Sequence, residues 1–178
     1  MTDALPSFDL KGRTALVTGA ARGIGPMDVT DLENSFAAID RASTEAGPID
    51  ILVNNAGGGI ADMAINARPD DFDSVIERNV KSAFFLSQRV ARHLIEAGRG
   101  GNIINVSSQA GLVALPGESV YCLAKAAVSH MTRSLAVEWG KYGIHVNAVC
   151  PTFIETPGTR DALSDLDSGR TRSNASPH

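Results

Sequence analysis

Four short apolar segments alternate with longer amphipathic ones along this chain. The apolar segments lie in residues 11–18, 49–54, 101–108 and 144–150, and each contains a short cluster of aliphatic side chains. Runs of this length and composition are typical of strands in a parallel sheet that is covered on both faces. We therefore predict four buried strands at these positions.

Three amphipathic helices are predicted between the strands, over residues 30–46, 69–97 and 119–139. The first begins with the pattern Thr-Asp-Leu-Glu, a capping box in which Thr30 is the N-cap. The second carries a long apolar stripe that Asn79 interrupts, and a buried asparagine can simply satisfy backbone groups there. Strands that alternate with helices predict an α/β fold built on a parallel sheet.

Length and charge limit the class of protein. A chain of 178 residues with 43% hydrophobic content suits one domain, expected over residues 1–163, and the aperiodic residues 164–178 are expected to form a disordered tail. The net charge of -4, without any run of Lys or Arg, argues against nucleic acid as a partner. No membrane span and no signal peptide are recognisable, so we expect a cytoplasmic location.

The cysteines and histidines do not indicate a metal site. Cys122 and Cys150 could form a disulfide or bind a metal, but small packed thiols are the simpler interpretation. None of the four histidines stands at metal-ligand spacing from a cysteine or carboxylate. We therefore expect no bound metal.

Ser108, Tyr121 and Lys125 are candidates for a proton-transfer site. Ser108 ends a predicted strand, and the carboxyl ends of parallel strands face a ligand crevice. Tyr121 and Lys125 are four residues apart on a predicted helix, so they share one face. A free phenol titrates near pH ~10, and a neighbouring ammonium lowers its pKa toward the range useful for acid/base catalysis. The same pair could also stand at the solvent edge of any amphipathic helix.

The wider sequence resembles the short-chain dehydrogenase/reductase family of classical type. Its motifs are matched in order by Thr18-Gly-Ala-Ala-Arg-Gly-Ile-Gly25, Asn54-Asn-Ala-Gly57, Asn79, Ser108, Tyr121-Cys-Leu-Ala-Lys125 and Asn147-Ala-Val-Cys-Pro151. The resemblance implies a Rossmann-like sheet and a hydride transfer between NAD or NADP and an alcohol or ketone.

The resemblance also implies roles for individual residues. Asn79, Ser108, Tyr121 and Lys125 would be the catalytic set, in which Asn79 holds a water linked to Lys125. Tyr121 and Lys125 would also contact the cofactor. The other cofactor-binding residues would be Gly19, Arg22, Gly23, Ile24, Gly25, Asp28, Val29, Asn55, Ala56, Gly57, Pro151, Ile154 and Thr156.

The chain departs from the family pattern after Gly25. A helix and a strand that selects NAD or NADP should follow, but Pro26 and the segment that resembles the adenine-lining Asp28-Val29 follow instead. An internal deletion and a truncated C-terminus are therefore expected, and the cofactor preference cannot be read. Because crossovers between parallel strands are right-handed, the remaining helices should lie mainly on one face of an incomplete sheet of about four strands.

Two functions remain open. The first is an oxidoreductase of this family with impaired activity in this chain. The alternative is a non-catalytic variant that pairs with full-length relatives, because the helices spanning about 70–97 and 119–140 commonly form the family's dimer interface. Either way a homo-oligomer through these helices is expected, and the substrate of the enzyme would be a small alcohol or carbonyl compound.

Overall fold

A computed structural model describes residues 9–20, 28–152 and 154 of the chain. It contains one sheet of four parallel strands in the order β1-β2-β3-β4. The strands are β1 (Ala15–Val17), β2 (Ile51–Asn54), β3 (Gly101–Val106) and β4 (Ile144–Val149). All four predicted strands are present, each somewhat shorter than its apolar run. The expected tail over residues 164–178 lies outside the described part of the chain.

Four helices accompany the sheet. They are α1 (Leu32–Glu45), α2 (Pro69–Ile76), α3 (Ser82–Glu96) and α4 (Ser119–Trp139). The bounds predicted for the last helix are confirmed. The helix predicted over 69–97 is present as a continuous helical run from Pro69 to Glu96, in which a π-helical turn at Glu77–Lys81 lies between α2 and α3. Within the described residues, no helix combines the length and the apolar character that crossing a membrane requires.

The N-terminus of α1 is capped differently from the prediction. Asp31 is the N-cap, and its carboxylate accepts a hydrogen bond from the backbone N–H of Asn34 at 3.1 Å. Thr30 instead donates its backbone N–H and its hydroxyl to the carboxylate of Asp28, at 2.9 and 2.7 Å. The prediction of a capping box with Thr30 as N-cap is therefore wrong by one residue. The hydroxyl of Thr30 is bonded to Asp28 in the preceding turn, so Asp31 caps the helix instead.

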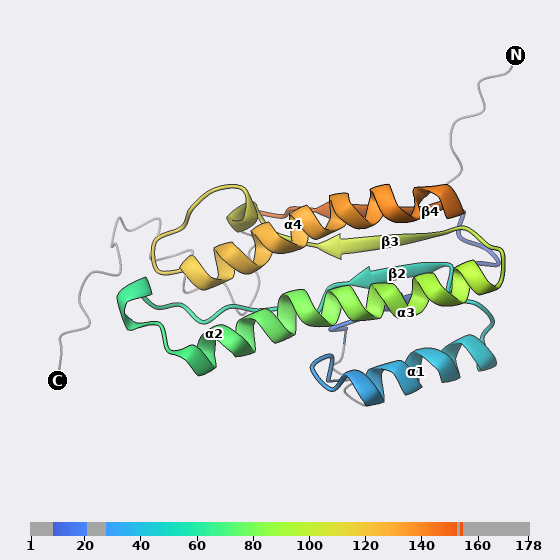
Figure 1. Cartoon of the computed structure of the whole chain (residues 1–178), viewed down its shortest axis with the longest axis horizontal. Coiled ribbons are helices and arrows are strands. Elements are labelled where there is room, and N and C mark those ends of the chain that lie inside the picture. The colour runs from blue at the N-terminus through green and yellow to red at the C-terminus, as the bar shows by residue number, and fades with distance from the viewer. Residues whose placement is uncertain (1–8, 21–27, 153, 155–178) are drawn as a thin grey trace, which may run out of the picture.

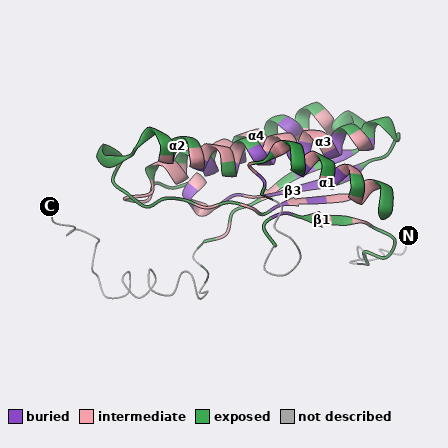
Figure 2. Ribbon diagram, turned by 90° about the horizontal axis from the view of Figure 1, so that it is seen from below, coloured by how far each residue is buried: buried purple, intermediate pink, exposed green. Residues whose placement is uncertain are grey.

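All of the described helices lie on one face of the sheet. Successive strands are added in one direction, so right-handed crossovers place every connecting helix on the same side. Figure 1 shows α1, α3 and α4 side by side in front of the strands, and Figure 2 shows this helical layer above the sheet with no described helix below it. The expected incomplete sheet with helices mainly on one face is confirmed.

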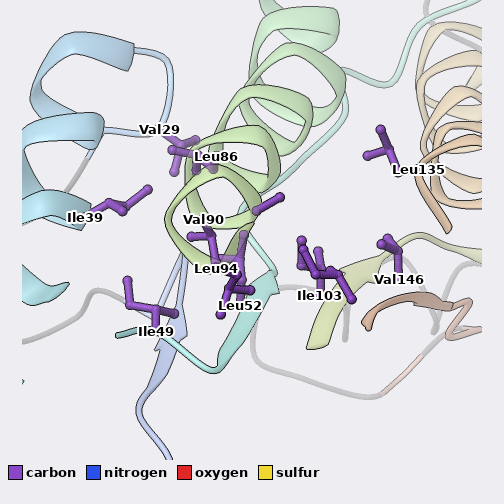
Figure 3. Packing of buried hydrophobic residues seen from close by; sticks show 12 residues of the cluster. Val29, Ile39, Ile49, Leu52, Leu86, Val90, Leu94, Ile103, Leu135 and Val146 are labelled. Atoms are coloured by element: carbon purple, nitrogen blue, oxygen red, sulfur yellow. The ribbon is translucent and has the colours of Figure 1, made fainter. Parts of the chain in front are cut away.

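The hydrophobic core fills the space between the helices and the sheet. Leu52, Ile103 and Val146 point from adjacent strands in the same register, and each is at most 4% exposed. Figure 3 shows them facing the buried side chains of the helices. The helical contribution to this core includes Ile39, Leu86, Val90, Leu94 and Leu135.

The opposite face of the sheet, here called the open face, consists of the alternate strand positions. Its side chains are Ala15, Val17, Ile51, Val53, Asn102, Ile104, Val106, His145, Asn147 and Val149. Val17 and Val149 are 45% and 48% exposed, whereas Leu52, Ile103 and Val146 on the core face are buried. Within the described residues, an aliphatic surface that would normally be covered therefore faces outward.

One group of ion pairs holds α1 to α3, and a second group holds the chain after α3 to the start of the sheet. Asp40 on α1 accepts hydrogen bonds from Arg89 on α3, with Nε of Arg89 at 2.8 Å, and lies 3.2 Å from Nε2 of His93. The Arg89 guanidinium beside Asp40 lowers the pKa of this carboxyl. These contacts fix α1 against α3 and so position the segment Asp28–Val29 that precedes α1.

The second group surrounds Asp50, whose side chain is only 3% exposed at the start of β2. Its carboxylate accepts the backbone N–H of Thr14 at 2.9 Å and lies 2.5 Å from Arg99 and 3.4 Å from Arg13. Burial raises the pKa of Asp50, but the bonds from Thr14 and Arg99 together with the charge of Arg13 outweigh it, so the pKa is lowered.

Asp50→Asn is expected to lower the free energy of unfolding by about 2 kcal/mol at neutral pH, because two arginines lose their charged acceptor. A lowered folded-state pKa gives stability that is present above the unfolded pKa and is lost as the pH falls through the folded value. The difference between the proteins should therefore shrink below about pH 4. Urea titrations followed by the fluorescence of the single tryptophan, Trp139, measure both effects. An unchanged difference at acid pH would contradict this account.

Candidate active site

Tyr121 and Lys125 lie one turn apart near the start of α4. Tyr121 is half-buried, whereas Lys125 is 4% exposed. The ammonium Nζ of Lys125 donates a hydrogen bond to the carbonyl of Val106 at the end of β3, at 2.9 Å. Nζ also lies over the ring of Tyr121, 5.5 Å from its centroid. The predicted juxtaposition of the phenol and the ammonium is therefore present.

Ser108 follows β3 by two residues and reaches the same site. Its backbone is extended, and it caps the short 3-10 turn at Gln109–Gly111 by accepting the N–H of Ala110 at 3.1 Å. A hydrogen bond between Ser108 and Tyr121 favours the ionised phenol. The carboxyl end of β3 and the N-terminal turns of α4 thus bring Ser108, Tyr121 and Lys125 together, as the sequence predicts.

The pKa of Tyr121 departs from the sequence-based expectation. Burial raises the pKa of the phenol, the hydrogen bond with Ser108 opposes this, and the charges of Glu118 and Cys122 raise it further. The net pKa lies above its ordinary value, so the expected lowering by Lys125 is wrong for this chain. The reason is that burial disfavours the phenolate more than Ser108 stabilises it. Tyr121 therefore carries its proton at neutral pH.

The pKa of Lys125 is lowered, but the side chain remains an ammonium at neutral pH. Burial lowers the pKa of Lys125 to about 8, and the neighbouring Cys150 opposes this change. The side chain is thus still mostly protonated at neutral pH. It can act as a buried cation that is fixed by Val106.

Asn79 lies in the π-helical turn and is 2% exposed. Its amide Nδ2 donates to the carbonyls of Gly58 and Val75 at 2.7 and 2.8 Å, and its Oδ1 accepts the N–H of Gly58 at 3.2 Å. Asn79 therefore satisfies backbone groups, which is the alternative that the sequence left open, and the bond to the carbonyl four residues earlier accompanies the π-helical turn.

Gly57 lies where Asn79 and Lys125 approach each other. A Cβ at Gly57 would stand 2.7 Å from Oδ1 of Asn79 and 3.1 Å from Nζ of Lys125. Only a residue without a side chain leaves these polar groups their present positions. The loop after β2 is therefore fitted to the side chains of Asn79 and Lys125, and not only to the sheet.

A buried polar network that the sequence analysis missed orients β3 and α4. Asn54 donates to Asn105 at 2.8 Å, and Asn105 donates to Thr132 at 2.9 Å, which links β2, β3 and α4. Ser107 donates to the carbonyl of Lys125 at 2.9 Å and is bonded to Ser129 at 2.8 Å. The sequence feature that could have predicted this network is the presence of polar residues at the inward positions of otherwise aliphatic strands.

A pocket of about 450 Å³ lies beside these side chains, at the carboxyl ends of β1 and β2. Its lining residues are Gly19, Asp28, Val29, Asn55, Ala56, Gly57 and Arg78. Six of these seven were expected to bind the cofactor, and the structure brings them together. Arg78 was not expected, because only the fold places this part of the π-helical turn next to the glycine loop.

The junction between β1 and β2 explains the shape of the pocket. The hydroxyl of Thr18 accepts the N–H groups of Asn55 and Ala56 at 3.0 and 3.1 Å. Gly19 adopts φ +69°, and a Cβ there would stand 2.7 Å from Cα of Ala56. Only glycine permits this conformation and this close approach. The resulting open, glycine-lined cradle fits the phosphate-bearing part of a dinucleotide.

The remaining predicted cofactor residues are only partly described. The carbonyl of Pro151 accepts the N–H of Gln109 at 2.9 Å, and Thr152 donates its hydroxyl to Oε1 of Gln109 at 2.7 Å. The turn after β4 is thereby tied to the turn after Ser108. Ile154 is 60% exposed. Residues Arg22, Gly23, Ile24, Gly25 and Thr156 lie outside the described residues.

Comparison with known proteins identifies relatives of this chain. The family model for short chain dehydrogenase matches residues 26–167, and so begins directly after the glycine loop. The 2-dehydro-3-deoxy-D-gluconate 5-dehydrogenase of Dickeya dadantii is 33% identical over 205 aligned residues, covering 92% of this chain and 80% of that protein. The oxidoreductase UcpA of Escherichia coli is 37% identical over 193 residues, covering 83% of this chain and 72% of that protein.

The alignment with the Dickeya enzyme also contains positions that this chain lacks. The share of this chain aligned with the Dickeya enzyme, 92% of 178 residues, is about 164 residues, so about 41 of the 205 aligned positions have no counterpart here. Together with the start of the family match at Pro26, this supports an internal deletion after Gly25.

Solved structures agree with the sequence relatives. The gluconate 5-dehydrogenase from Burkholderia cenocepacia in complex with NADP and tartrate has a TM-score of 0.79 and 31% identity, covering 90% of this chain and 80% of that one. A 4-hydroxyisoleucine dehydrogenase complexed with NADH has a TM-score of 0.72 and 30% identity, covering 83% and 65%. Fold, motifs and relatives agree, and the chain belongs to the short-chain dehydrogenase family.

Proposed function

We propose that this chain is an oxidoreductase that transfers a hydride between NAD(P) and a small alcohol or carbonyl compound, with reduced capacity to hold the cofactor. The observation that carries the proposal is the assembly of Ser108, Tyr121 and Lys125 beside a glycine-lined pocket. Bound dinucleotide would supply or accept the hydride at the substrate carbon.

The side chains would divide the remaining chemistry. Ser108 would donate a hydrogen bond to the substrate oxygen, and Tyr121 would transfer its proton to that oxygen during reduction or remove it during oxidation. The raised pKa of Tyr121 favours the protonated phenol at neutral pH, which suits reduction. Lys125, fixed by Val106, would hold the nicotinamide ribose, and Asn79 would hold a water that connects Lys125 to solvent.

Activity would be measured with the full chain at millimolar NADH or NADPH and a panel of small ketones and aldehydes. We expect slow, carbonyl-dependent oxidation of the reduced nicotinamide. A chain that binds the cofactor but oxidises it with none of the carbonyl compounds would contradict the proposed function.

Affinity for NADH and NADPH is expected to be weak, with dissociation constants well above the micromolar range. A helix that directs its positive end and free N–H groups at the pyrophosphate normally follows the glycine loop. In this chain the first described helix after β1 is α1, which starts at Leu32 behind the acidic cap Asp31 and carries Glu33 in its first turn. Calorimetry that shows micromolar binding would contradict the expectation.

A second candidate function is pairing with full-length relatives or with another copy through α3 and α4. It is favoured by a surface hollow of about 250 Å³ between these helices, whose lining includes Ile95, Arg92 and Trp139. Val137 on α4 is 84% exposed. A pairing module would show no carbonyl-dependent oxidation of NADH or NADPH, which separates the two candidates.

A further inference from the structure

We propose that Arg78 binds a phosphate of the adenosine half of the dinucleotide and replaces the positive helix end that the deletion removed. This inference rests on the proposed function. It concerns a residue that lies outside the sequence motifs and reaches the pocket only because of the fold.

The backbone of Arg78 is held in place while its side chain remains exposed. Arg78 belongs to the π-helical turn, and its carbonyl accepts the hydroxyl of Ser82 at 2.6 Å. The next residue, Asn79, is fixed to the loop after β2 by hydrogen bonds to Gly58. A Cβ at Gly58 would stand 3.6 Å from Nη1 of Arg78, so the guanidinium lies next to the loop after β2.

The charges that line the pocket leave Arg78 available to an anion. Asp28 and Arg78 are the two charged residues of the lining that the structure describes. The carboxylate of Asp28 accepts both the N–H and the hydroxyl of Thr30, and these bonds lower the pKa of Asp28 more than the charge of Arg78 does. With the described residues the guanidinium of Arg78 forms neither an ion pair nor a hydrogen bond.

The chemistry of arginine suits this role. Its planar guanidinium binds phosphate through two parallel N–H groups, which a single lysine ammonium does not reproduce. Because α1 begins with Asp31 and Glu33, its N-terminus is already neutralised and offers little to a phosphate. Both the pyrophosphate common to NAD and NADP and the 2′-phosphate of NADP are possible sources of the anion.

The test uses the full chain and three probes: adenosine, ADP and the 2′-phosphorylated analogue of ADP. Dissociation constants are measured by ligand-observed NMR for the wild type, Arg78→Gln, Arg78→Lys and the control Arg41→Gln, whose residue is exposed on α1. We expect Arg78→Gln to weaken binding of a phosphorylated probe about tenfold and to leave adenosine unchanged. Arg78→Lys should recover part of the loss, and Arg41→Gln should resemble the wild type.

The outcomes distinguish the pyrophosphate from the 2′-phosphate as the anion that Arg78 binds. They also distinguish failure of the Arg78 inference from failure of the proposed function. A loss for both phosphorylated probes assigns Arg78 to the pyrophosphate, whereas a loss for the 2′-phosphorylated probe alone assigns it to NADP selection. Equal binding of both phosphorylated probes by the wild type and Arg78→Gln overturns the inference and leaves the proposed function standing. Failure of the wild type to bind NADH, NADPH or any probe would overturn both.

Discussion

The isolated chain should bind anilinonaphthalene sulfonate strongly, unfold over a broad temperature range and self-associate. The physical reason is the open face, on which Val17, Val53, Ile104 and Val149 form an aliphatic surface. Large contiguous apolar areas that are exposed mark binding or aggregation sites in folded proteins. In addition β1 is an edge strand of the sheet that the structure describes, and an exposed edge strand can pair with another chain. Dye fluorescence, calorimetry and light scattering measure the three effects.

A matched pair of substitutions tests whether the open face is the cause. Val149→Lys places a charge on the open face, whereas Ile65→Lys places one at a residue that is 92% exposed in the short 3-10 turn before α2. Only Val149→Lys should reduce dye binding and scattering. A sharp cooperative melt with a monodisperse monomer or dimer in the wild type would show that the open face is covered.

Tyr121→Phe should reduce carbonyl reduction by about a hundredfold to ten-thousandfold, the range that a positioned general acid contributes. The substitution removes only the hydroxyl, so the ring keeps its packing under Nζ of Lys125. Cofactor affinity should therefore change little while turnover falls. In the reverse direction, oxidation of an alcohol should accelerate as the pH rises, because the raised pKa leaves little phenolate at neutral pH.

The neighbouring Cys122 provides the control for this prediction. Its sulfur lies on the same turn of α4 and has only a weak contact with the carbonyl of Val113, at 3.9 Å. Cys122→Ala should keep most of the activity. If Tyr121→Phe retained comparable turnover at its own optimum pH, the assignment of proton transfer to Tyr121 would be wrong.

Periodicity and motif order predicted most of the fold. The bounds of α4 were predictable because its apolar positions and the glycines around it agree, and the one-sided helical layer followed from the right-handed crossovers. The π-helical turn was not predictable, since the apolar stripe continues across it. The turn coincides with hydrogen bonds from Asn79 to Val75 and to Gly58, twenty-one residues earlier.

The sequence predicted which residues meet in the candidate site, but not the direction in which the pKa of Tyr121 shifts. Sequence spacing places Tyr121 and Lys125 together, yet the direction of the Tyr121 pKa depends on burial, which a local pattern does not reveal. Arg78 was missed for a similar reason, because its proximity to Gly58 and Asp28 results from tertiary packing alone. Ser107 and Asn105 support α4 through bonds that only the folded sheet creates.

Transfer of deuterium tests the central claim most directly. The chain is incubated with small ketones and with millimolar NADH or NADPH that carries deuterium at the transferable position of the nicotinamide. Mass spectrometry should find deuterium on the new carbinol carbon with the wild type and almost none with Tyr121→Phe. Absence of deuterated alcohol with every ketone, from a chain shown to bind the cofactor, would contradict the assignment of this site to hydride transfer.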